Sequence, residues 1–386
     1  MKLCYVLPQY KTTSSENFFH IPNFLNELGK RFELYLIIEY FEGEVVDVPT
    51  AKKIFIIQDN VRLNIFKRTL KLLGVFLSLI KKGIKIFFVR SSLTGSLPLA
   101  LANRIYLGVN ARIIFWSCGQ DIVKISYFPT RRNIKRIFSK VLNRLVFLLV
   151  DYVATGPEKM ADYYSSRFKL DKDKILLLHN DISLDRFKFA KNSDRVSNKK
   201  SLFNTSQKTI LFVHTISFAR GADILIPISK YIVKNKKNVK IVVIGRQGNL
   251  TDKMEEISKN INYKNNFLFL GEISNADIVK YYQASDLFIM PSRGEGFPRV
   301  LLESMSTGCP VLSYDVGGVS QILPKKIHDE FLITLNDEEG FIKKIFQIIN
   351  NDKLLDYARE INYIEVKKYE TSNIADMYAK TINNLL

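Results

Sequence analysis

Residues 286–318 read DLFIMPSRGEGFPRVLLESMSTGCPVLSYDVGG, and this stretch decides the fold class of the chain. The apolar run Leu287–Met290 has the length of a buried strand, and a glycine-rich turn follows it. Pro298 stands where a first helical residue is expected, because its missing N–H is not needed there, and Gly308 ends that helix. Val311–Tyr314 is then a second strand. The order of strand, turn, helix and strand predicts one βαβ unit of a parallel sheet.

Two carboxylates belong to this unit. Glu295 lies in the turn before the helix, and Glu303 lies on the helix itself. A helix N-terminus at the carboxyl end of a parallel strand attracts anions, and an acid on the same element can hold sugar hydroxyls. The pattern therefore suits a phosphorylated sugar or a nucleotide. By periodicity alone, an ordinary βαβ unit with two surface glutamates fits as well.

Length and composition predict a folded protein of two domains. The chain has 386 residues, of which 47% are hydrophobic and 12% aromatic, and this length exceeds what one ordinary core holds. Strands and helices alternate along the sequence, which predicts an α/β protein with two Rossmann-like, doubly wound parallel sheets. We predict a first domain at 1–190, a linker at 191–207, a second domain at 208–368 and a terminal helix at 369–386.

The sequence predicts no metal site and a cytoplasmic location. Cys4, Cys118 and Cys309 have no paired spacing and indicate neither disulfides nor zinc. Asp171 and Asp173 have the spacing of a D-x-D metal motif, but lysines flank them, and we interpret the segment as a solvated turn. The amino-terminal residues lack the apolar core of a signal peptide, and no apolar run reaches the roughly 18 residues of a membrane span.

The net charge of +19 is concentrated in one quarter of the chain. Residues 51–150 contain 19 Lys and Arg against two acids, a net charge of +17. Within this window, 62–85 and 131–144 mix basic and apolar residues at helical spacing, which is typical of helices that lie on an anionic membrane surface. Solvated helices that cover a sheet are the alternative. Nucleic acid is not an expected partner, because no nucleic-acid motif accompanies the charge.

The membrane interpretation predicts weaker binding to anionic liposomes when basic residues of this window are replaced by serine. The residues chosen are Lys67, Arg68, Arg131, Arg132, Lys135 and Arg136.

The segment EGFPRVLLESMSTGCPV, with PSR before it and DVGG after it, resembles the E-x7-E signature of the retaining glycosyltransferases of family 4. Glu295 and Glu303 fall on its two acids. The resemblance implies a GT-B fold, a terminal helix that crosses back to the first domain, and a nucleotide-diphosphate sugar as donor. It implies no metal and no cofactor. In that family the second acid holds the ribose hydroxyls and the first contacts the transferred sugar.

The resemblance extends to the phosphate site. The segment VHTISFARG resembles the family's V-G-R-L-x-x-x-K-G segment, whose Arg and Lys grip the diphosphate. Arg220 falls on the Lys position, and Gly221 matches. Thr215 stands at the Arg position and His214 at the preceding glycine, so one cation is missing. The candidates to replace it are His214, Arg293 and Arg299. The other implied donor contacts are the backbone N–H groups of Gly296 and Phe297, and the segment from Gly271 to Ile273 beside the base.

The acceptor site implied by the resemblance lies in the first domain. The loop WSCGQD matches a family loop that carries a histidine near the reacting sugar. Cys118 takes the histidine position, and Gly119 and Asp121 fit the rest. Asp121 is the acid expected to orient an acceptor hydroxyl, and His20 is a candidate substitute for the missing imidazole.

We therefore predict a retaining glycosyltransferase of the hexosyltransferase type, with Glu295, Arg220 and Asp121 as its catalytic residues. It moves a sugar from a nucleotide-diphosphate sugar to a glycan or lipid-linked acceptor in cell-surface polysaccharide synthesis, at the inner face of the cell membrane. Two alternatives stay open. One is a degenerate GT-B protein that acts as a partner or scaffold, motivated by Thr215 and Cys118. The other is a GT-B nucleotide-sugar epimerase.

Overall fold

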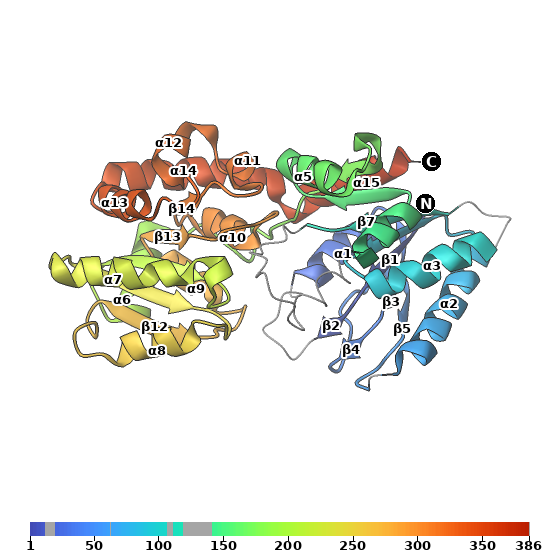
Figure 1. Cartoon of the computed structure of the whole chain (residues 1–386), viewed down its shortest axis with the longest axis horizontal. Coiled ribbons are helices and arrows are strands. Elements are labelled where there is room, and N and C mark those ends of the chain that lie inside the picture. The colour runs from blue at the N-terminus through green and yellow to red at the C-terminus, as the bar shows by residue number, and fades with distance from the viewer. Residues whose placement is uncertain (12–19, 62, 106–110, 119–140, 386) are drawn as a thin grey trace. The chain divides into compact units, whose positions relative to one another are not determined.

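The structure, a computed structural model, divides into two compact units (Figure 1). It describes residues 1–11, 20–61, 63–105, 111–118 and 141–385. The first unit contains the described residues up to His179 together with residues 371–385, and the second contains Asn180–Glu370. Each unit is a parallel sheet covered by helices, which confirms the predicted fold class.

The sheet of the first unit has the strand order β5-β3-β1-β6-β7-β8-β9. The order reverses between β1 and β6, as in a doubly wound sheet. The strands are β1 Lys2–Leu7, β3 Glu33–Ile38, β5 Ala51–Ile56, β6 Ile86–Arg90, β7 Arg112–Trp116, β8 Tyr152–Thr155 and β9 Ile175–Leu177, and the short strands β2 Tyr10–Lys11 and β4 Phe41–Glu42 pair with each other. Val6 of β1 lies between Ile37 and Val89 in register. Because β1 is central, it is apolar without alternation and Leu3–Leu7 are fully buried.

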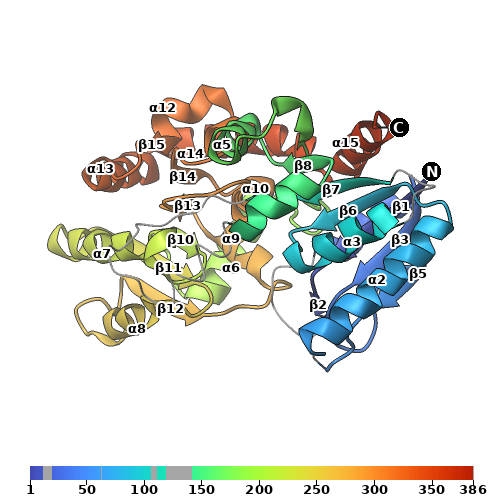
Figure 2. The same cartoon turned by 45° about the vertical axis from the view of Figure 1, so that its right-hand side comes forward.

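Helices pack on this sheet through one apolar stripe each. They are α1 Ile21–Gly29, α2 Ile65–Lys81, α3 Leu93–Ile105 and α5 Glu158–Phe168. In α2 the buried stripe consists of Leu72, Phe76, Leu79 and Ile80, and Phe76 makes an edge contact with Phe87 of β6 at 5.9 Å between ring centroids. Helices α2 and α3 lie side by side on the first unit (Figures 1 and 2). In the part of the chain that the structure describes, every helix is too short or too polar to cross a membrane.

The second unit has the strand order β12-β11-β10-β13-β14-β15, which reverses between β10 and β13. The strands are β10 Lys208–Val213, β11 Val239–Ile244, β12 Phe267–Gly271, β13 Leu287–Met290, β14 Val311–Tyr314 and β15 Leu332–Ile333. The α-helices are α6 Asn192–Phe203, α7 Leu225–Lys234, α8 Thr251–Lys259, α9 Ile278–Ala284, α10 Arg299–Thr307, α11 Val319–Ile322, α12 His328–Phe331, α13 Glu338–Ile349 and α14 Asp352–Val366. Strands β13 and β14 and helix α10 are the βαβ unit predicted from residues 286–318.

The boundary between the units differs from the predicted one. Residues 180–190 were predicted in the first domain, but the structure assigns them to the second unit. Asn180 donates its side-chain amide to the carbonyl of Phe297 at 2.9 Å, and the N–H of Ile182 donates to the carbonyl of Tyr369 at 2.8 Å. These bonds form between residues far apart in the sequence, so no local pattern revealed them.

The segment 191–207, predicted as a linker, contains helix α6. Its sequence has no helical apolar stripe, and only Phe203 is buried. The helix is held by tertiary ion pairs instead: Arg195 lies 3.5 Å from Asp286, and Lys199 also binds that carboxylate. Periodicity in the sequence cannot reveal a helix of this kind.

The terminal helix α15, Thr371–Asn383, belongs to the first unit, which confirms the crossing expected from the sequence. It packs on α1, where Arg31 Nε donates to Asp376 Oδ1 at 2.6 Å. Tyr378 lies against Phe24 with 4.9 Å between ring centroids, and its hydroxyl donates to the carbonyl of His179 at 3.4 Å.

Candidate functional site

The predicted donor residues of the second unit gather at the carboxyl ends of neighbouring strands. His214 and Thr215 follow β10, and Glu295 lies in the loop after β13. The strand order reverses between β10 and β13, and parallel sheets bind ligands outside the carboxyl ends of strands at such a switch point. The topology therefore brings together residues that are about 80 positions apart in the sequence.

Glu295 is the centre of this cluster. Its side chain is only 8% exposed, and its Oε1 lies 3.2 Å from His214 Nε2. Arg220 Nη1 donates to the same oxygen, and it also donates to the carbonyl of Gly294 at 3.1 Å. Burial raises the pKa of the Glu295 carboxyl, but the hydrogen bond from His214 and the charges beside it lower that pKa by more, so the net direction is down. Glu295 is thus held as a carboxylate in a fixed position.

His214 has a defined role in this arrangement. The backbone N–H of Thr215 donates to His214 Nδ1 at 2.9 Å, so this nitrogen is an acceptor. In the neutral ring the proton then lies on Nε2, which donates it to Glu295. His214 therefore orients the carboxylate of Glu295; the sequence named it, with Arg293 and Arg299, as a candidate for the missing phosphate cation.

Two glycines on neighbouring loops allow a close approach to the loop that carries Glu295. Gly221 has a φ of +74°, and a Cβ there would lie 1.9 Å from the carbonyl oxygen of Pro291. Gly317, after β14, has a φ of +54°, and a Cβ would lie 1.7 Å from the carbonyl oxygen of Glu295. Next to it, the N–H of Gly318 donates to the carbonyl of Gly296 at 3.1 Å. The loop that carries Glu295 is thereby held from both sides.

We expect Gly317→Ala to destabilise the second unit and to displace the Glu295 loop. The left-handed backbone costs roughly 1–3 kcal/mol for a residue with a side chain, and the contact with the Glu295 carbonyl adds to that cost. Urea unfolding of the whole chain measures the loss. Gly271→Ala is the matched control, because Gly271 has a similar φ of +67° but no atom within 4 Å of its Cβ position. Equal losses in the two variants would show that the close approach is unimportant.

Glu303 lies on α10 in a second, separate cluster. Its side chain is buried, and Tyr282 donates its hydroxyl to Oε2 at 3.2 Å. Burial raises the pKa of Glu303, although Arg299, Tyr282 and Arg186 oppose that shift. Burial of Arg186 lowers the pKa of its guanidinium, and the negative charge of Glu303 opposes that fall. The site thus has a second carboxylate with two guanidinium groups beside it.

The sequence missed Arg186 and Tyr282. Arg186 Nη2 donates to the carbonyl of Asn275 and so reaches the loop after β12, where Gly271 and Ile273 were predicted beside the base. Arg186 belongs to residues 180–190, which were predicted in the first domain. No spacing in the sequence connects it with Glu303.

The structure distinguishes the candidates for the missing cation. Arg293 forms two hydrogen bonds with Asp223, at 2.7 and 2.8 Å, and its guanidinium lies 3.9 Å from the ring centroid of Phe218. It therefore holds the short 3-10 turns η2 Phe218–Arg220 and η3 Ala222–Ile224 in place. Arg299 Nη1 lies 3.1 Å from Asp181 Oδ1 and faces the Glu303 cluster. The carboxylate of Glu295 is instead bound by His214 and Arg220.

Other predicted donor residues lie along the same loops. Gly296 and Phe297 directly follow Glu295, and Phe297 is buried against Tyr369 with 5.4 Å between ring centroids. The carbonyl of Gly271, at the end of β12, accepts from the N–H of Gly245 at 2.8 Å. The prediction assigns the backbone N–H groups of Gly296 and Phe297 to the ligand, and places the segment from Gly271 to Ile273 beside the base.

Of the predicted acceptor residues, His20 and Cys118 belong to the first unit. Gly119 and Asp121 lie outside the described residues. Cys118 comes two residues after the end of β7. His20 is buried just before α1, and its Nε2 lies 3.4 Å from Arg90 Nη2, while the Arg90 guanidinium stacks 4.3 Å from the ring centroid of Trp116. Across the described residues, no group of three or more His, Cys, Asp or Glu side chains is placed to hold a metal ion.

Comparisons with known proteins find similarity to glycosyltransferases. A family model described as "Glycosyl transferases group 1" matches residues 193–364. An uncharacterized glycosyltransferase of Methanocaldococcus jannaschii is 26% identical over 188 residues, 48% of each sequence. The UDP-Gal:alpha-D-GlcNAc-diphosphoundecaprenol alpha-1,3-galactosyltransferase of Escherichia coli is 27% identical over 232 residues, 56% of each sequence. The chain thus spans about half the length of these two relatives.

A likeness to a solved structure covers the whole chain. Anabaena HepE, crystallised in complex with UDP-glucose, superposes with a TM-score of 0.75 at 15% identity, and the match covers 100% of both chains. At this identity the likeness concerns the fold. The two units described above are those of a GT-B fold, as the sequence predicted.

Proposed function

We propose that this chain, a glycosyltransferase by its glycosyl transferases group 1 domain at residues 193–364, transfers a sugar from a nucleotide-diphosphate sugar with retention of anomeric configuration. The observation that carries the proposal is the arrangement of Glu295, His214 and Arg220 at the switch point of the second sheet. Glu303 lies on the helix that follows Glu295, at the spacing of the family-4 signature. The GT-B fold and the matching domain support the same activity.

In the proposed reaction, each donor-site residue acts on one part of the nucleotide sugar. Glu303 accepts hydrogen bonds from the ribose hydroxyls, and Glu295 accepts them from hydroxyls of the transferred sugar. Negative charge grows on the diphosphate as the anomeric C–O bond breaks, and a cation placed there stabilises that charge in the transition state. Arg220 donates hydrogen bonds to Glu295 and to the carbonyl of Gly294, and we assign it as the cation beside the diphosphate. The leaving phosphate takes the proton of the acceptor hydroxyl on the same face, so the loss of the family histidine at Cys118 is tolerated.

We further propose a uridine diphosphate sugar as donor and a lipid-linked glycan as acceptor. The HepE structure contains UDP-glucose, and the Escherichia coli relative is named for UDP-Gal and an undecaprenol-linked acceptor. No metal or cofactor enters the proposed reaction.

A screen of purified chain with UDP-, GDP- and ADP-sugars tests the donor. Mass spectrometry follows donor hydrolysis and transfer to extracted lipid-linked acceptors, with Glu295→Ala as the control protein. We expect turnover of one UDP-hexose that is lost in the control. Donor binding without any turnover would favour the alternative of a partner or scaffold, and conversion of one free nucleotide sugar into another would favour an epimerase.

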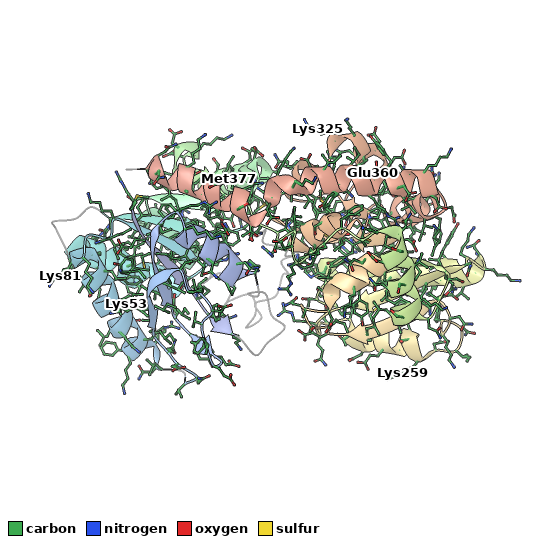
Figure 3. The ribbon with its side chains drawn as sticks, turned by 180° about the vertical axis from the view of Figure 1, so that it is seen from behind. Lys53, Lys81, Lys259, Lys325, Glu360 and Met377 are labelled. Carbon is green, nitrogen blue, oxygen red and sulfur yellow. The ribbon has the colours of Figure 1, made fainter. Side chains whose placement is uncertain are left out.

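The proposed place of action is the inner surface of the cell membrane, in cell-surface polysaccharide synthesis, and helix α2 provides the structural support. At its start it exposes Ile65, Phe66 and Leu70 by 70%, 69% and 52%. Lys67 is exposed on the same turn, and Arg68 is adjacent. Lys81, at the other end of α2, also projects away from the first unit (Figure 3). Apolar residues with neighbouring cations are the chemistry that binds an anionic lipid surface.

We expect Lys67→Ser with Arg68→Ser to weaken binding to phosphatidylserine vesicles roughly thirtyfold at low salt, because each cation near the surface contributes about 1 kcal/mol. Vesicle sedimentation measures the effect. Lys230→Ser with Lys234→Ser, which removes two exposed cations from α7, is the charge-matched control. Equal weakening in both variants would contradict the assignment to α2. The other four basic residues chosen from the sequence, Arg131, Arg132, Lys135 and Arg136, lie outside the described residues.

A further inference from the structure

A pocket of about 470 Å³ lies beside helix α6 in the second unit. Five of its lining residues belong to one face of this helix, at helical spacing: Asn192, Arg195, Val196, Lys199 and Lys200. The loop 204–206 after the helix and Asp286, just before β13, complete the lining. Its volume falls within the roughly 300–1,000 Å³ that small-molecule sites occupy.

The composition of this face differs from that of a packing surface. A helix that only packs on a sheet presents apolar residues at these spacings, but α6 presents three cations, an amide and the exposed Val196. Asp286 is 5% exposed and is already bound by Arg195 and Lys199, and by the N–H of Thr209 at 2.7 Å. It compensates one of the three positive charges. Two positive charges therefore remain in excess at the pocket.

Hydrogen-bonding groups surround these charges. The loop contributes the amide of Asn204 and the hydroxyl of Ser206. The hydroxyl of Thr205 already donates to Gln207 Oε1 at 3.0 Å, and Asn192 Oδ1 accepts from Arg195 Nη1 at 3.2 Å. Arg195 and Lys199 are held by Asp286, with side chains only 13% and 16% exposed, so they are ordered before any ligand arrives. Ordered cations together with neutral hydrogen-bonding groups suit an anion that carries hydroxyls.

The pocket is separate from the donor site. Asp286 precedes β13, whereas Glu295 follows it, so the two sites lie at opposite ends of the strands. Strand β13 is four residues long, which at about 3.3 Å per residue gives it a length of roughly 13 Å. A ligand in the pocket therefore does not occupy the place of the nucleotide sugar.

We propose that this pocket binds a phosphorylated sugar as a second ligand of the second unit. The phosphate monoester lies between Lys200 and the ordered pair of Arg195 and Lys199, and its two negative charges match the two in excess. The sugar hydroxyls bond to Asn204 and Ser206. This binding does not depend on the proposed transfer reaction.

Calorimetry with the full chain tests the proposal, with glucose 6-phosphate, glucose 1-phosphate, inorganic phosphate and glucose as probes. Each titration is made with and without saturating UDP, because UDP occupies the donor site. We expect binding of at least one sugar phosphate in the presence of UDP and none of glucose. Inorganic phosphate that binds as tightly as the sugar phosphates would overturn the assignment to a sugar. Absence of sugar-phosphate binding at millimolar concentrations would overturn the proposal entirely.

Two variants locate the site without disturbing Asp286. Lys200→Gln removes an exposed cation, and Asn204→Gly removes an amide at a residue whose φ of +45° glycine adopts readily. We expect each to weaken sugar-phosphate binding about five- to tenfold. Lys230→Gln on α7 is the control and is expected to change it less than twofold. If Lys200→Gln and Asn204→Gly bind as the unaltered chain does, the sugar phosphate binds elsewhere and the proposal is wrong.

Discussion

Replacing Glu295 with glutamine is expected to remove sugar transfer while UDP binding stays nearly unchanged. The carboxylate is held by His214 and Arg220 in a position where the proposed function has it contact the transferred sugar, not the nucleotide. Loss of one preorganised electrostatic contact typically lowers kcat by about 10²–10³-fold. We therefore expect that loss in kcat, and less than a threefold change in the dissociation constant of UDP.

The measurements are transfer rates with the donor identified by the screen, and calorimetry with UDP. Stability is the accompanying control. The folded-state pKa of Glu295 is lowered, so its stabilising contribution is present above the unfolded pKa and is lost as the pH falls through the folded pKa. Glu295→Gln should thus be less stable than the unaltered chain at neutral pH, and the difference should shrink in acid. A variant that keeps normal transfer would refute the role given to Glu295.

Replacing Glu303 with glutamine is expected to weaken UDP binding while the rate of transfer changes little. Its carboxylate is proposed to bind the ribose, which is common to UDP and the UDP-sugar. Hydrogen bonds to a charged group contribute about 1.5–3 kcal/mol, so we expect UDP affinity to fall roughly ten- to a hundredfold. The rate at saturating donor should change much less. Together the two variants separate the sugar contact from the ribose contact, because one affects turnover and the other affects binding.

Glu303→Gln should also stabilise the folded chain at neutral pH. Burial raises the folded-state pKa of Glu303, so the stability linked to its protonated form is present below the unfolded pKa and is lost as the pH rises through the folded pKa. Glutamine is neutral throughout and avoids this loss. We expect a higher melting temperature than that of the unaltered chain at pH 7, and a smaller difference near pH 4. A lower melting temperature at pH 7 would show that the attraction of Arg186 and Arg299 for the Glu303 carboxylate outweighs the free-energy cost of burying that charge.

The sequence predicted well those features that local patterns determine. The βαβ unit with Glu295 and Glu303 follows from an apolar run of strand length, a glycine-rich turn and a helix that Gly308 ends. The parallel sheets follow from the alternation of strands and helices. The motif spacing indicated Arg220 as the partner of the diphosphate, and the structure adds that this arginine already binds Glu295.

The tertiary structure decided what depends on residues far apart in the chain. The sequence by itself determined the fold class and the two acids, because apolar periodicity and glycine positions act within a few residues. It did not determine that residues 180–190 belong to the second unit, that Arg186 lies beside Glu303, or that α6 is a helix held by Asp286. Those features depend on ion pairs and hydrogen bonds that form only once the sheet has brought distant strand ends together.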